Sequence, residues 1–187
     1  MYTITDLKPG TAITIDGEPY LVVTSQFGRK SQSKANMQCK LKNLKTGAFI
    51  AKNFQGSEKI EPADVGFRRV QYLYSDDDTS TFMDLGSYDQ FPLPTEVVEE
   101  QKEFLKEGQE VDALMYGEKP IGIKLPSTVT LKVTETMPGV RGDTATGGNK
   151  QATLETGLQV NVPLFINEGE MVKVNTETGA YMERASD

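Results

Sequence analysis

Residues 20–41, YLVVTSQFGRKSQSKANMQCKL, contain two apolar-rich runs on either side of a polar segment. Residues 20–24 and 37–41 have the length and composition of strands, and the segment between them is short enough for a hairpin loop. The loop, residues 29–34, carries Arg29, Lys30 and Lys34 in a chain whose net charge is −7. The pattern predicts a β-hairpin with a basic tip, which is either a solvated loop or a probe for a phosphate backbone.

The segments around this hairpin predict a small barrel. Residues 11–15 alternate in polarity, and Asp16-Gly17 is a strong turn signal because both positions of a type I′ turn need positive φ. A further run at residues 48–54 brings the total to about five short strands within roughly 60 residues. We expect residues 1–63 to form an SH3-like (KOW-type) barrel.

The rest of the chain predicts two more barrels. In residues 64–127, strand-like runs at 67–74, 79–84, 110–116 and 120–125 surround one short helix at 94–105, which indicates an OB-fold. In residues 128–187, runs at 129–136, 151–154, 157–162 and 171–174 flank a long loop, 138–150, without apolar periodicity, and indicate a second OB-fold. The predicted fold class is all-β, with three tandem small β-barrels.

The residue types that are missing argue against most catalytic chemistry. The chain has no histidine and a single cysteine, Cys39, so imidazole-based triads, imidazole metal sites and thiolate zinc clusters are excluded. It also lacks a phosphate-cradling Gly-rich loop with its lysine. We therefore expect a binding protein and no enzyme, with no catalytic residues, no metal and no cofactor. Cys39 is expected to be buried, and Phe27, Phe49 and Phe54 to lie in or near a core.

Three features favour the cytoplasm. No run approaches the roughly 18 apolar residues of a membrane span, so no membrane partner is expected. The N-terminal residues lack the basic and apolar regions of a signal peptide. A lone cysteine cannot form an internal disulfide.

Charge is distributed unevenly along the chain. Residues 1–63 carry nine Lys and Arg against five Asp and Glu, a balance of +4. Because the whole chain has a net charge of −7, the remaining residues carry −11. A basic first third on an acidic body would orient the molecule in the field of a polyanion. Ordinary variation of surface charge explains the same numbers, and the composition does not separate the two readings.

Several motifs in order along the chain resemble bacterial translation elongation factor P. The most specific is GLQVNVPLFINEG at residues 157–169, preceded by KQA at 150–152 and GDTATGG at 142–148. DGEPY at 16–20, KLKNLKTG at 40–47 and YLY at 72–74 are similar to the same family. The resemblance spans essentially the whole chain, whereas the homologous archaeal and eukaryotic initiation factor five-A has only the first two domains.

The resemblance implies an architecture and a function. Members of the family are L-shaped, tRNA-like proteins of three β-barrels that bind the 70S ribosome between the peptidyl-tRNA (P) and exit (E) sites. There they relieve stalling at consecutive prolines by stimulating peptide bond formation. Positioning of the peptidyl-tRNA needs no acid or base from the factor, which agrees with a chain that has no histidine. The implied partners are the ribosome, the P-site peptidyl-tRNA, rRNA and the E-site mRNA codon, with the factor as a monomer.

The family presents a modified lysine or arginine at the tip of the hairpin. Alignment without gaps from Phe27 to residues 40–44 places Gln32 at that position, flanked by Ser31 and Ser33. Glutamine cannot be lysylated or rhamnosylated, so we expect an unmodified tip whose amide reaches the CCA end of the tRNA by hydrogen bonds. A two-residue slip would place Lys30 or Lys34 at the tip instead. In the main alignment Arg29, Lys30 and Lys34 contact tRNA or rRNA phosphates.

The resemblance also assigns residues in the third barrel. Gly142, Asp143 and Thr144 match the loop that approaches the E-site codon and the small subunit, with a flexible Gly-rich loop as the alternative. Tyr181 and Arg184 match C-terminal residues that support ribosome binding, through stacking on a nucleotide and pairing with phosphate. Packing of Tyr181 that closes the barrel is an alternative for that residue.

A general single-stranded RNA-binding protein built from OB-folds is the competing hypothesis. Such proteins combine a basic groove with aromatic side chains on which bases stack. In residues 64–187, which carry a net charge of −11, we expect no strand face that is basic and rich in aromatic residues. The elongation-factor hypothesis is therefore favoured over general RNA binding.

Overall fold

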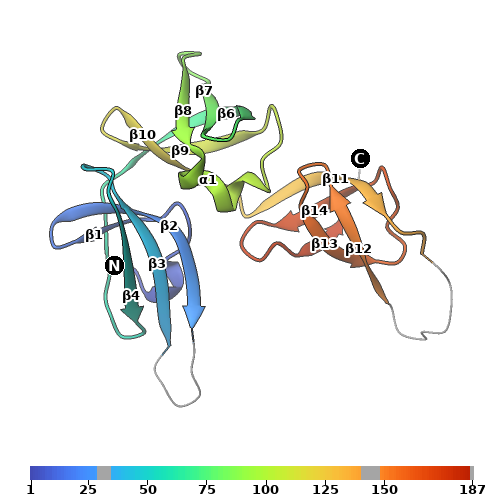
Figure 1. Ribbon diagram of the computed structural model, residues 1–187, viewed down its shortest axis with the longest axis horizontal. Coiled ribbons are helices and arrows are strands. Elements are labelled where there is room, and N and C mark those ends of the chain that lie inside the picture. The colour runs from blue at the N-terminus through green and yellow to red at the C-terminus, as the bar shows by residue number, and fades with distance from the viewer. Residues whose placement is uncertain (29–34, 140–147, 186–187) are drawn as a thin grey trace. The chain divides into compact units, whose positions relative to one another are not determined.

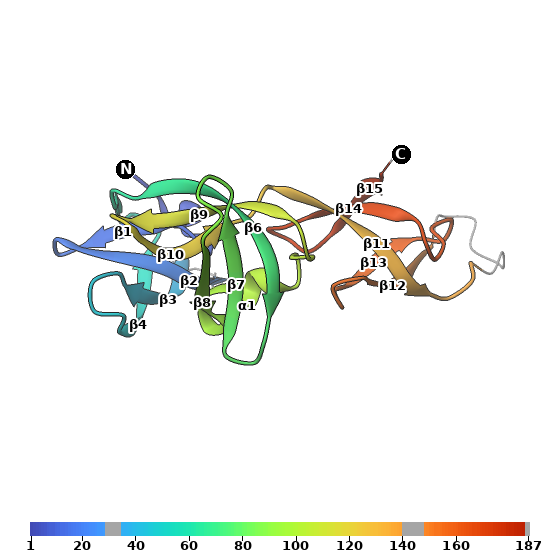
Figure 2. The ribbon, with the colours of Figure 1, turned by 90° about the horizontal axis from the view of Figure 1, so that it is seen from above.

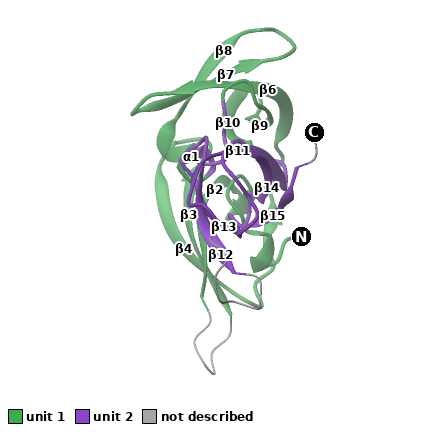
Figure 3. Cartoon of the chain, turned by 90° about the vertical axis from the view of Figure 1, so that its right-hand side faces the viewer, with its two compact units in different colours: residues 1–100, 107–124 green, residues 101–106, 125–187 purple. Residues whose placement is uncertain are grey.

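The computed structural model describes residues 1–28, 35–139 and 148–185, which form three five-stranded antiparallel sheets in succession (Figure 1). The predicted all-β fold class with three small barrels is confirmed. The chain divides into two compact units (Figure 3). Unit 1 comprises residues 1–100 and 107–124 with the first two sheets, and unit 2 comprises residues 101–106 and 125–187 with the third.

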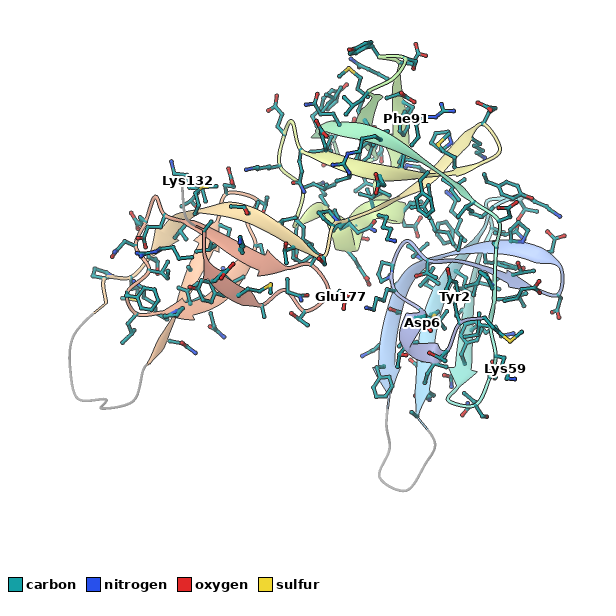
Figure 4. The ribbon with its side chains drawn as sticks, turned by 180° about the vertical axis from the view of Figure 1, so that it is seen from behind. Tyr2, Asp6, Lys59, Phe91, Lys132 and Glu177 are labelled. Atoms are coloured by element: carbon teal, nitrogen blue, oxygen red, sulfur yellow. The ribbon has the colours of Figure 1, made fainter. Side chains whose placement is uncertain are left out.

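The first sheet has the strand order β4-β3-β2-β1-β5. Asp16 and Gly17, which join β1 to β2, have φ of 52° and 79°, as the predicted turn requires. A short 3-10 helix, η1 (Ile4–Asp6), precedes the sheet; the Asp6 carboxylate accepts the Thr3 N–H at 2.8 Å (Figure 4). The strands are β1 (Ala12–Ile15), β2 (Glu18–Gly28), β3 (Asn36–Asn43), β4 (Phe49–Gln55) and β5 (Glu61–Pro62).

The core of the first sheet follows the alternation of β3. Met37, Cys39 and Leu41 are buried, whereas Gln38 between them is exposed. Burial raises the pKa of the Cys39 thiol to about 11, so this cysteine is a protonated core residue, as expected.

The prediction for the three phenylalanines was correct in part. Phe54 is buried and Phe49 is half-buried, but Phe27 is 53% exposed. Residues 20 and 21 of β2 pair with both β1 and β3, whereas residues 24–28 pair with β3 alone. Phe27 therefore lies on an edge segment of the strand, where its ring has less of the sheet around it.

The second and third sheets share one topology. The second has the order β10-β9-β6-β7-β8 and the third β13-β12-β11-β14-β15, so in each the first strand is central and the second and fourth flank it. This agreement was expected from the similar strand patterns. The strands are β6 (Gly66–Ser75), β7 (Thr79–Asp84), β8 (Gln90–Pro94), β9 (Glu110–Tyr116), β10 (Lys119–Lys124), β11 (Thr128–Thr136), β12 (Asn149–Leu154), β13 (Gln159–Pro163), β14 (Met171–Asn175) and β15 (Tyr181–Arg184).

In the second and third sheets the central strand pairs with an antiparallel neighbour on both sides. β6 pairs with both β7 and β9, and β11 pairs with both β12 and β14 (Figure 2). Phe82 on β7 is fully buried, and its ring stacks on Phe91 of β8 with centroids 6.0 Å apart.

The segment after the helix contributes to a different core from the helix itself. Helix α1 (Thr95–Lys102) ends three residues before the predicted end. Its Val97 and Val98 are buried in unit 1, whereas Phe104, just beyond it, belongs to the hydrophobic core of unit 2. The apolar residues of the segment that the sequence predicted as one helix, 94–105, are therefore divided between two cores.

A tight turn between β7 and β8 is built around Asp84. Its side chain is 7% exposed and accepts the N–H groups of Gly86 at 2.7 Å and Ser87 at 3.1 Å. Arg68 on β6 lies 3.3 Å from the same carboxylate. The N–H of Ser87, then that of Gly86, and then the Arg68 charge hold the pKa of Asp84 below its ordinary value, against the effect of burial.

Replacing Phe104 by alanine should destabilise unit 2. Truncation of a buried phenylalanine costs about 3–5 kcal/mol, and the ring lies in the core of the third sheet. Amide hydrogen exchange should accelerate in β11–β15, whereas the control Val97→Ala should accelerate exchange in β6–β10. Faster exchange in β6–β10 for Phe104→Ala would contradict this assignment.

Replacing Asp84 by asparagine should change how stability depends on pH. A carboxylate whose pKa is lowered by folding stabilises the protein above its ordinary pKa, and this stabilisation is lost as the pH falls through the lowered value. The midpoint of urea unfolding should therefore be lower for Asp84→Asn at neutral pH, and the wild-type curve should approach it in acid. Asp89→Asn, which removes an exposed carboxylate from the same turn, is the control; parallel curves for Asp84→Asn and wild type would contradict the prediction.

Candidate nucleic-acid interface

The predicted hairpin has a regular antiparallel stem. β2 and β3 pair through Phe27↔Met37 and Gly28↔Asn36, up to the limit of the described residues. A Cβ atom at Gly28 would lie 2.4 Å from the Asn36 Oδ1. A larger residue at position 28 would therefore require the Asn36 side chain to shift. The predicted tip residues lie outside the described part of the chain: Arg29, Lys30, Ser31, Gln32, Ser33 and Lys34.

The outer face of the stem is lined by amide side chains. Gln26 is in register with Gln38, Gln38 with Asn53, and Asn36 with Gln55. A shallow hollow of about 390 Å³ lies on this face. Amides donate and accept hydrogen bonds without charge, so this face can bind sugar hydroxyls and base edges as well as phosphates. These amides were not predicted as site residues from the sequence, although polar residues at alternate positions of β3 were a signal for them.

A lysine–aromatic cluster continues this face. Lys40 and Lys42 of β3 lie over the Phe49 ring, with their Nζ atoms 4.7 Å and 5.6 Å from its centroid. Lys40 also forms an ion pair with Glu96 of α1. Burial lowers the pKa of Lys42, and the neighbouring charge of Lys119 lowers it further, against the opposing effect of Glu96. The cluster thus combines half-buried ammonium groups with an aromatic ring, as nucleic-acid-binding sites do.

In unit 2, the flanks of the predicted codon-facing loop are tightly held. Gly142, Asp143 and Thr144 themselves lie outside the described residues. On one side a Cβ on Gly139 would lie 2.4 Å from the carbonyl oxygen of Leu164, so this position needs glycine to pack against that backbone. On the other side the Lys150 Nζ donates to the Met137 carbonyl at 2.7 Å.

The two predicted C-terminal residues lie on β15 in different environments. Tyr181 is half-buried and packs against the core of the third sheet, so the packing role considered as its alternative is present. Arg184 is 58% exposed, and its Nη1 donates to the Glu170 Oε1 at 3.2 Å. The N–H of Asn167 and then Arg184 lower the pKa of Glu170, which therefore stays ionised beside the guanidinium.

Neither a metal site nor a membrane helix emerges from the described residues. In residues 1–28, 35–139 and 148–185, acidic, cysteine and histidine side chains form no group of three able to hold a metal ion. No helix within the same ranges is long and apolar enough to cross a membrane.

Comparison with known structures gives matches of low overall similarity. Eukaryotic translation initiation factor 5A from Methanococcus jannaschii is 24% identical, with 66% of this chain and 92% of that chain covered and a TM-score of 0.35. A translation initiation factor eif-5a family protein from Naegleria fowleri is 18% identical, with 66% and 96% covered and a TM-score of 0.34. Scores this low do not establish a shared overall structure.

Comparison with protein-family models gives three matches in order along the chain. Residues 3–60 match the elongation factor P (EF-P) KOW-like domain, residues 65–123 the elongation factor P (EF-P) OB domain, and residues 129–184 the elongation factor P C-terminal domain. Each match falls on one of the three sheets. Because together these matches span nearly the whole chain, the chain belongs to the elongation factor P family of translation factors.

Proposed function

We propose that this translation factor binds the 70S ribosome between the P and E sites and stimulates peptide bond formation at consecutive prolines. The observation that carries the proposal is the ordered set of three elongation factor P domains. The proposed domains are residues 1–63, 64–127 and 128–187, each of which contains one sheet. The factor acts in the cytoplasm as a monomer and has no catalytic group of its own.

The proposed mechanism is positioning of the peptidyl-tRNA. Proline is a poor nucleophile in peptide transfer, and its fixed φ restricts the nascent chain. A factor that holds the reacting end of the tRNA in a productive geometry lowers the entropic part of the barrier. The paired stem of β2 and β3 supports such a role, because a two-stranded arm can carry a short tip with Gln32, Ser31 and Ser33 toward the CCA end.

The remaining contacts are proposed from the family and from the charges. Arg29, Lys30 and Lys34 bind phosphates beside the tip, and the basic balance of residues 1–63 supports this orientation. Gly142, Asp143 and Thr144 approach the E-site codon. Tyr181 supports ribosome binding chiefly by packing, since it is half-buried, whereas Arg184 is exposed enough to reach rRNA phosphate.

Replacing Gln32 by alanine should slow synthesis through consecutive prolines. Loss of one hydrogen bond of ~1 kcal/mol corresponds to a rate roughly fivefold lower. The measurement is the yield of peptide on templates with and without a proline run in a reconstituted translation system. Templates without the run serve as the control and should be unaffected.

The same experiment separates the two tip registers. If Lys30 or Lys34 is the working residue, its alanine variant will abolish the stimulation and Gln32→Ala will not. Mass spectrometry of the protein from its native host provides an independent check, because an adduct on Lys30 or Lys34 would contradict the Gln32 assignment.

Replacing Lys30 by alanine should weaken ribosome binding in a salt-dependent manner. Each phosphate contact that is lost makes the slope of log affinity against log salt shallower by about 1. Lys59→Ala, which removes an exposed lysine at another place in the first barrel (Figure 4), is the matched control and should leave the slope unchanged. Binding to free oligonucleotides but not to 70S ribosomes would instead support general RNA binding and contradict the proposed function.

A further inference from the structure

The second sheet carries an exposed aromatic surface beside a hollow of about 570 Å³. The hollow is lined by Phe67, Arg68, Arg69, Asp84, Gly86 and Ser87. Phe67 is 58% exposed, and Tyr88, next along the chain from Ser87, is 71% exposed. We call Phe67, Arg68, Arg69 and Tyr88 the aromatic–arginine surface. Because large aromatic side chains that are exposed at or next to a hollow mark interaction sites, we expect this surface to bind a partner.

The backbone holds Tyr88 in an unfavourable conformation. Its φ is +63°, a region that a bulky L-residue rarely adopts because its Cβ atom crowds the backbone. The Tyr88 N–H donates to the Asp84 carbonyl at 2.8 Å, and the Asp84 carboxylate accepts the N–H groups of Gly86 and Ser87. The turn therefore fixes an exposed tyrosine where glycine would fit without strain, which points to a role for the ring outside the fold.

The two arginines are neutralised within the protein. Arg68 lies 3.3 Å from Asp84 and 3.4 Å from Glu118, and Arg69 lies 3.3 Å from Glu110 and 3.2 Å from Asp112. Each guanidinium thus has two carboxylates of its own, so neither is a free cation. Both are fixed in place as flat, polar contact surfaces.

The surface as a whole is acidic. The carboxylates around it are those of Asp84, Asp89, Glu110, Asp112 and Glu118, and the cations are Arg68, Arg69 and Lys124. An excess of negative charge disfavours an RNA backbone and favours a cationic partner. The lysine–aromatic cluster of the first sheet has the opposite balance, with Lys40, Lys42 and Lys119 near Glu96.

One cation already occupies the aromatic part of this surface. The Lys124 Nζ lies 5.7 Å from the centroid of the Phe67 ring. This contact shows that the ring accepts an ammonium group. A second aromatic ring, that of Tyr88, is exposed one residue along the chain from Ser87, which lines the hollow. The exposed Tyr88 ring can bind lysine or arginine side chains in the same way, and the surrounding carboxylates attract their charge.

We propose that the aromatic–arginine surface binds a lysine- or arginine-rich protein segment of the ribosome. The aromatic rings would contact the cationic side chains of the partner, and the carboxylates would balance their charge. The two arginines would donate hydrogen bonds to the peptide backbone of the partner. The ribosomal origin of the segment rests on the proposed function. The local charge and the exposed aromatic rings favour a cationic protein segment over RNA.

The test uses the full chain with Tyr88→Gly and Phe67→Ala. Tyr88→Gly removes the ring at a position where glycine is unstrained, so it should fold with undiminished thermal stability and yet bind 70S ribosomes about tenfold more weakly, as loss of an aromatic hot spot does. Phe67→Ala should weaken binding similarly. The matched control is Tyr74→Ala, since Tyr74 is also exposed, at 57%, but lies at the other end of β6.

A photo-reactive benzoylphenylalanine at position 88 identifies what the surface touches. Crosslinking to a ribosomal protein, at a peptide rich in lysine and arginine, is the expected result. Crosslinking only to rRNA or tRNA, or to a second copy of the chain, would overturn the proposal, as would unchanged ribosome binding by Tyr88→Gly. If the wild-type protein does not bind ribosomes at all, the proposed function fails and the ribosomal origin of the partner fails with it.

Discussion

Each of the three sheets has to build a hydrophobic core from one side of five short strands. On β11 the buried residues are Val129, Leu131 and Val133, and Val172 and Val174 face them from β14. Side chains alternate between the two faces of a strand, so a slip of one residue would move a whole apolar set into solvent. Burial thus sets the strand registers, and the opposite faces remain available for polar residues.

The candidate nucleic-acid interface is a consequence of this constraint. On β3 the residues between the buried Met37, Cys39 and Leu41 must point outward, and in this chain they include Gln38 and Lys40. Pairing with β2 and β4 places further amides beside them. A strand pair that is apolar on one side and hydrogen-bonding on the other can hold a hairpin rigidly while its outer face contacts RNA.

Local pairing of charges separates two kinds of surface in unit 1. Lys40 and Lys42 lie over Phe49 with Glu96 as the carboxylate beside them, whereas Arg68 and Arg69 each have two carboxylates. The net charge of a segment does not reveal this difference, because it counts charges without their neighbours. The acidic character of residues 64–187 therefore coexists with arginines whose charge is balanced by neighbouring carboxylates.

The sequence by itself determined the all-β class, the three successive sheets and the membership of a translation-factor family. Strand alternation, the Asp16-Gly17 turn and family motifs are local signals, so they can be read without a structure. It did not indicate that Phe27 is exposed, that Phe104 lies beyond the helix and packs in a different core, or that Tyr88 has a positive φ. Only the tertiary structure decided these points, because each depends on which distant strand lies beside the residue: β1 stops short of Phe27, the third sheet surrounds Phe104, and Arg68 of β6 braces the Asp84 turn that presents Tyr88.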